Sequence, residues 1–192
     1  MTTLTTTAST VLPEQRGRTR ATLLVTAAIA AATALLDLLT RQSPDHLTTA
    51  GDYAFTVMLF PFVLGPIAAI TMLHRMQDGR DGRLGQAGYL VTVTALAAFI
   101  PCGIASLVTG DTQALGPVYV LAMLGSLAGL IVFAIGLVRA RVLPRWAGPL
   151  LPVAWLAGGP VTEGGSPGFR GAALILAAAL TAIAITLPDA EA

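Results

Sequence analysis

Six apolar stretches separated by short polar segments constrain this chain more than any other feature. The longer ones have about the twenty residues that an α-helix needs to cross ~30 Å of hydrocarbon. The 192 residues are 55% hydrophobic and only 11% charged, whereas soluble domains carry roughly 25% charged residues. A water-soluble fold would lack polar surface, so the sequence predicts an all-α integral membrane bundle.

Six transmembrane helices are expected within a domain of residues 16–188. The predicted spans are 21–40, 53–73, 86–108, 117–138, 147–161 and 171–187. The first apolar run is too long for the core of a signal peptide and no A-x-A site follows it, so an uncleaved first helix is expected. Residues 1–15 are threonine-rich and are expected to form a disordered cytoplasmic tail, and residues 189–192 form a short acidic one.

The distribution of arginine predicts the orientation. An apolar helix ends within residues 137–155, LVRARVLPRWAGPLLPVAW, and three arginines follow within a short turn. Alternating faces from a cytoplasmic N-terminus place nine arginines inside: Arg16, Arg18, Arg20, Arg75, Arg80, Arg83, Arg139, Arg141 and Arg145. Only Arg41 and Arg170 fall outside. Because basic residues accumulate in cytoplasmic loops, this bias predicts a multi-pass protein of the bacterial cytoplasmic membrane with both termini in the cytoplasm.

Two of the predicted spans are irregular. Pro61 and Pro66 lie inside the second one and predict a kink near mid-membrane, since each proline removes a helical donor. The fifth, 147–161, is only about 22 Å long at ~1.5 Å per residue. It either spans by borrowing flanking residues or is a re-entrant segment buried in protein, and spanning is favoured.

Small residues mark a packing face on the fourth span. Gly125 and Gly129 form a G-x-x-x-G pair, and Gly136 continues the stripe at helical spacing. Such glycines let two helix backbones approach closely. In a polytopic protein this face packs internally more often than it dimerises, so a homo-oligomer is left open.

Asp37 is the one acidic residue inside a predicted span, and it lies in the outer part of the hydrocarbon. Arg41 is four residues further on, which is the spacing of a helical salt bridge. One interpretation is an ion pair that anchors the helix end. The other is a carboxyl acid that faces a central cavity and serves as a catalytic residue.

The loops predicted to be external hold further residues that could bind a cation or another small molecule: Asp45, His46, Asp52, Asp111 and Glu163. A concentration of carboxylates could bind a cation, or a diphosphate through Mg²⁺. No spacing matches a metal motif, so no metal site is predicted, and ordinary loop solvation explains these residues equally well.

On the inner side, His74 and Arg75 close the second span, and Asp78 and Asp81 lie in the D-G-R-D-G-R turn. Alternating charges and glycines predict a compact, solvated loop here. Contact between its arginines and lipid head groups is the alternative.

Several function classes find no support in the sequence. There is no Walker A, G-x-S-x-G or G-x-G-x-x-G motif, so ATPase, hydrolase and dinucleotide-binding functions are not indicated, and no cofactor is expected. The arginines form no basic face, so nucleic acid is not an expected partner. A single cysteine, Cys102, excludes an intramolecular disulfide.

Residues 73–90, LHRMQDGRDGRLGQAGYL, and 136–151, GLVRARVLPRWAGPLL, carry a resemblance. They are similar to six-helix polytopic membrane proteins of high-GC bacteria with an R-x-x-V-L-P-R-W-A-G turn. The resemblance covers roughly residues 50–155 and implies a compact helical bundle but no reaction. A fainter likeness is to small membrane-bound terpene cyclases, although an aromatic content of 6% is low for stabilising carbocations.

Three functions are therefore expected to compete. The favoured one is a non-catalytic membrane component, such as an accessory, immunity or hydrophobic-ligand-handling protein. Its partners would be the bilayer and a hydrophobic small molecule. The alternatives are a membrane enzyme acting on an isoprenoid or lipid with Asp37 as its acid, and a small transporter subunit.

Overall fold

The structure is a computed structural model that describes residues 13–40, 46–158 and 171–187. Within these ranges the chain is helical, apart from turns and one isolated β-bridge between His46 and Asp111. The helices are α1 (Pro13–Leu39), α2 (Ala50–Met76), α3 (Gly82–Ala97), α4 (Phe99–Thr109), α5 (Gly116–Ala140), α6 (Ala147–Gly158) and α7 (Ala173–Ile185). The prediction of an all-helical chain is confirmed for these residues.

Four stretches of the described chain are long and apolar enough to cross a membrane. They are Glu14–Leu39, Ala50–Met76, Gly82–Thr109 and Gly116–Ala140, with 26, 27, 28 and 25 residues. At ~1.5 Å per residue each exceeds the ~30 Å of the hydrocarbon core. Helices α6 and α7 are also apolar but have only 12 and 13 residues.

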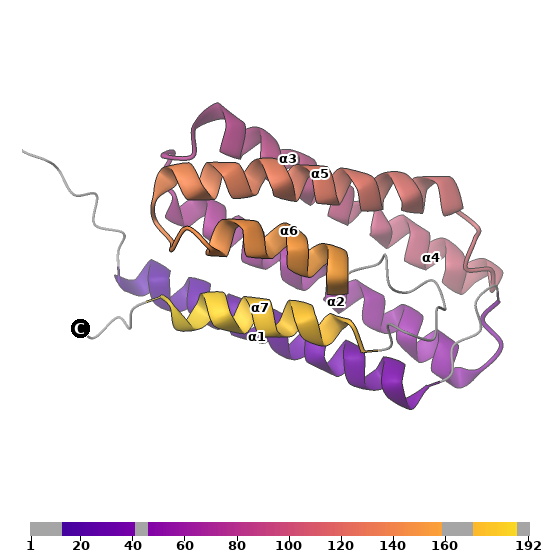
Figure 1. Cartoon of the computed structure of the whole chain (residues 1–192). Coiled ribbons are helices and arrows are strands. Elements are labelled where there is room, and N and C mark those ends of the chain that lie inside the picture. The colour runs from indigo at the N-terminus through magenta and orange to yellow at the C-terminus, as the bar shows by residue number, and fades with distance from the viewer. Residues whose placement is uncertain (1–12, 41–45, 159–170, 188–192) are drawn as a thin grey trace, which may run out of the picture.

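The helices lie side by side, and their axes are roughly aligned (Figure 1). Helices α3 and α5 lie along one edge of the bundle, α1 and α7 lie along the other, and α2 and α6 lie between them. Three arginine-bearing segments share the left end of this view: the start of α1, the α2–α3 turn and the α5–α6 turn. The C-terminal end of α7 lies there too. We call this end the arginine-rich end.

The helix bounds differ from the predicted spans at their polar ends. Helix α1 begins at Pro13, where proline's fixed φ suits the first turn, so residues 13–15 are helical rather than part of a tail. A 2.6 Å ion pair between Glu14 and Arg18 lies on this exposed first part of α1. Helix α2 begins at Ala50, three residues before the predicted span, because Thr49 and Asp52 form a capping box.

Prolines act differently in two of the long helices. Helix α2 continues through Pro61 and Pro66, and the Thr26 hydroxyl of α1 donates to the Gly65 carbonyl beside the second proline at 3.1 Å. The third long stretch instead divides at Ala98 into α3 and α4. Pro101 explains this break, since it cannot donate to the Ala97 carbonyl and its ring crowds that group.

Helix α6 is short and ends against the start of α7. A Cβ on Gly158 would lie 2.6 Å from the Ala172 carbonyl oxygen, so the two backbones touch there. Near the end of α6, Trp155 donates from Nε1 to the Ser126 hydroxyl of α5 at 2.9 Å and stacks on Phe62 of α2. Helix α6 thus ends beside the middle of α5, and residues 159–161 of the predicted span lie outside the described residues.

Helices α3 and α5 pack closely against each other, and small residues form the contact. Their facing pairs are Gly85 with Gly136, Gly88 with Phe133, Thr92 with Gly129, and Ala95 with Gly125. A Cβ on Gly129 would lie 2.6 Å from the Thr92 backbone nitrogen, and one on Gly88 would collide with the Phe133 backbone. The glycine stripe of α5 therefore packs inside the chain, against α3.

Candidate functional site

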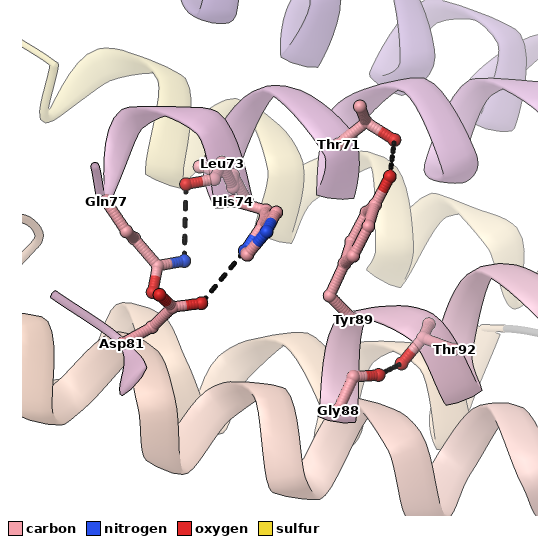
Figure 2. A network of polar contacts seen from close by, with 8 residues as sticks. All are labelled: Thr71, Leu73, His74, Gln77, Asp81, Gly88, Tyr89 and Thr92. Carbon is pink, nitrogen blue, oxygen red and sulfur yellow. Dashed lines mark hydrogen bonds and ion pairs between the residues drawn. The ribbon is translucent and has the colours of Figure 1, made fainter. Parts of the chain in front are cut away.

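A network of polar side chains lies at the arginine-rich end, where α2 turns into α3 (Figure 2). The Asp81 carboxylate and the His74 ring nitrogen Nδ1 are 2.8 Å apart. The Asp81 side chain is only 2% exposed, and that of His74 is 24% exposed. The expectation of a compact, solvated loop is thus wrong for Asp81, because its carboxylate is buried against His74.

The local sequence explains how Asp81 reaches this position. Asp78, Gly79 and Gly82 all adopt positive φ, which reverses the chain between α2 and α3. Glycine adopts such angles without the cost that a side chain brings. Gly85, four residues after Asp81, leaves room for the carboxyl because a Cβ at Gly85 would collide with it.

Two aromatic rings pack against the His74 imidazole. Tyr89 of α3 stacks on it with a centroid distance of 4.3 Å and an interplanar angle of 10°. Phe133 of α5 makes a tilted contact at 6.4 Å. The Tyr89 hydroxyl lies 3.4 Å from that of Thr71, one turn deeper along α2. His74 is therefore held by α2, α3 and α5 together.

Gln77 completes the network and contains an unpartnered atom. The residue is fully buried, and its Nε2 donates to the Leu73 carbonyl at 3.2 Å. Its Oε1 has no hydrogen-bond partner among the described residues. Figure 2 shows the amide reaching toward the same side of the turn as the Asp81 carboxyl.

Chemically, this network can orient an imidazole and accept a proton at the arginine-rich end. When Nδ1 carries the proton toward Asp81, Nε2 is left as an acceptor. The same contacts tie the α2–α3 turn to the α3–α5 pair, which is a structural role. Sequence reasoning placed His74 at the end of the second span and Asp81 in the turn that follows, but it missed their contact, since the positive φ angles that reverse the chain are seen only in the structure.

Asp37 lies near the C-terminal end of α1 and is partly buried. Its Oδ2 accepts a 2.8 Å hydrogen bond from the backbone nitrogen of Gly171, just before α7 begins. A carboxylate at the N-terminus of a helix also complements the helix dipole. This contact makes Asp37 a tie between α1 and α7, while its predicted partner Arg41 lies outside the described residues.

The acidic residues that were predicted to lie in the external loops are not gathered into one site where the structure describes them. Asp52 is 2% exposed, and its Oδ2 accepts hydrogen bonds from the backbone nitrogens of Thr48 and Thr49 at 3.0 and 2.8 Å. Asp111 accepts a 2.8 Å bond from the Gln113 nitrogen within its own turn. Both carboxylates therefore stabilise local backbone.

His46 lies beside Asp111, to which it is joined by an isolated backbone β-bridge. Asp45 and Glu163, the other two predicted ligands, lie outside the described residues. In the part of the chain that is described, no group of three or more His, Cys, Asp or Glu side chains is placed to hold a metal ion.

An apolar groove with a volume of about 460 Å³ lies between α3 and α5, on the lateral surface of the bundle. Eight side chains line it: Leu90, Val91, Thr94, Ala95, Ala98, Val118, Leu121 and Ala122. Leu90, Val91 and Leu121 are 54%, 48% and 70% exposed, so the groove opens sideways from the bundle. Sequence reasoning missed it, because its depth comes from the small residues that bring the two helices together.

Comparison with known proteins adds no relative: no protein-family model, no curated protein and no solved structure matches this chain.

Proposed function

We propose that this chain is a multi-pass protein of the bacterial cytoplasmic membrane, with its arginine-rich end and both termini on the cytoplasmic side. Four apolar helices of membrane length support the membrane location. The gathering of three arginine-bearing segments at one end of the bundle supports the orientation. In this proposal α6 and α7 complete a six-span bundle.

Within the membrane, the protein acts as a non-catalytic component that holds the apolar part of a hydrophobic molecule. The groove between α3 and α5 is the observation that carries this function. It is lined almost wholly by apolar side chains, and Thr94 is its one hydroxyl-bearing member. Such a lining matches an alkyl or isoprenoid chain better than a polar substrate.

Two alternatives keep narrower support. A membrane enzyme with Asp37 as its acid would need that carboxyl to face a substrate, whereas its bond to Gly171 supports a structural role. A transporter subunit would use the short helix α6 to line a transport path. This helix ends beside Ser126, near the middle of α5, and does not reach the N-terminal end of α5.

The test uses a long-chain fatty acid carrying a diazirine and an alkyne, added to cells that express the protein. Photolysis followed by peptide mapping should place most of the cross-links on α3 and α5. Thr94→Trp fills the groove and should reduce cross-linking several-fold. Ile185→Trp is the matched control, because Ile185 of α7 is 67% exposed and lies outside the groove.

Even labelling over all the lipid-facing helices, unchanged by Thr94→Trp, would show only annular lipid and would exclude a ligand-holding groove.

A further inference from the structure

Two exposed arginines, Arg83 of α3 and Arg139 of α5, extend the faces that form the groove. Arg83 precedes Leu90 by seven residues, about two helical turns, so both lie on one face of α3. Arg139 follows Leu121 by 18 residues, about five turns at ~3.6 residues per turn, and lies on the same face of α5. Each helix thus carries one cation in line with its groove-lining residues.

The two arginines also lie at the same level of the bundle. Gly85 and Gly136 are in contact, since a Cβ on Gly136 would lie 2.7 Å from the Gly85 Cα. Arg83 and Arg139 are two and three residues beyond this contact, both toward the arginine-rich end. The nearby Asp81 carboxyl is turned inward to His74, so it does not cover this side of α3.

The distance along α3 matches one leaflet of a bilayer. From Arg83 to Ala98, at the far end of the groove, there are 15 residues, or about 22 Å at ~1.5 Å each. One leaflet with its head-group layer is about 20–22 Å thick, half of a whole bilayer. A lipid whose head group contacts the two arginines would therefore place an acyl chain along the groove.

We propose that the occupant of the groove is an anionic phospholipid of the arginine-side leaflet. Its phosphate is held by Arg83 and Arg139, and one of its acyl chains lies between α3 and α5. This inference rests on the proposed ligand-holding function and names the ligand class. Guanidinium groups bind phosphate oxygens in bidentate fashion. Charge complementarity selects a head group of net negative charge, since a zwitterionic head group would bring a cationic ammonium beside the two arginines. The groove itself selects only a long apolar chain.

Native mass spectrometry of the full-length protein can test this with phosphatidylglycerol and phosphatidylcholine of identical acyl chains. The parent should bind phosphatidylglycerol more tightly. The double variant Arg83→Gln/Arg139→Gln should lower that preference by roughly tenfold, because each basic residue near the head groups contributes to anionic-lipid binding. Arg75→Gln/Arg145→Gln is the control, since it removes the same charge from two exposed residues that belong to neither α3 nor α5.

The outcomes separate this inference from the proposed function. Loss of the preference in the first double variant alone supports the inference. Equal loss in both double variants would indicate general attraction by the arginine-rich end and would overturn it. Equal binding of the two lipids by the parent, still blocked by Thr94→Trp, would overturn the head-group assignment and leave the groove function intact. If Thr94→Trp changes the binding of neither lipid, the groove function itself fails.

Discussion

Gly129→Ala offers the sharpest test of the α3–α5 packing. The added methyl would lie 2.5 Å from the Thr92 hydroxyl oxygen and 2.6 Å from the Thr92 backbone nitrogen. A hydroxyl can rotate away, but a backbone atom inside a helix cannot move without shifting α3. The new methyl therefore has to push the two helices apart or distort one of them.

The expected cost follows from two opposing terms. Overpacking a tight interior costs about 1–3 kcal/mol. Replacing glycine by alanine inside a helix returns up to about 1 kcal/mol of helix propensity. We expect Gly129→Ala to lower the free energy of unfolding by about 1–2 kcal/mol.

Gly125→Ala is the matched control, since it lies one turn earlier in the same G-x-x-x-G pair. Its new methyl would meet the Ala95 Cβ at 3.2 Å, a contact that a small displacement relieves. Propensity should offset this contact, so the unfolding free energy should stay within about 0.5 kcal/mol of the parent.

The assay is unfolding in mixed micelles by titration with sodium dodecyl sulfate, followed by the fluorescence of buried Trp155. Equal stability of the Gly125 and Gly129 variants, or a gain in stability for Gly129→Ala, would refute the close approach of α3 and α5.

Three further predictions concern the ends of the bundle. Asp81→Ala removes the carboxylate that holds His74, and should lower the unfolding free energy by about 1–3 kcal/mol, while Asp81→Asn keeps an acceptor and should cost less; equal effects of the two would count against the hydrogen bond. Asp37→Asn retains an acceptor for the Gly171 nitrogen and should keep stability within about 1 kcal/mol and function intact, whereas a stable but inactive variant would favour the membrane-enzyme alternative. On intact cells, an impermeant maleimide should label Gln113→Cys but not Arg80→Cys, both at exposed positions at opposite ends of the bundle, and the reverse pattern would invert the orientation.

The sequence alone determined the features that depend on short stretches of chain. The length and the residue composition of the apolar runs predicted the long helices, because the hydropathy of a segment and the distance it can span do not depend on its neighbours. The turns that carry most of the arginines were equally visible, as was the small-residue stripe on the fourth span. The number of spans and the orientation remain predictions, since hydropathy indicates where a helix can cross but not whether α6 and α7 do.

Only the tertiary structure decided which side chains meet. Asp81 was expected to be solvated, yet positive-φ residues turn it under the loop to His74. Asp37 was expected to pair with Arg41 or face a cavity, and in the structure it bonds a backbone nitrogen 134 residues away. The α3–α5 groove likewise depends on the register between two helices. Such contacts are set by how helices rotate and slide against each other, and apolar sequences leave that choice open because many faces are similarly hydrophobic.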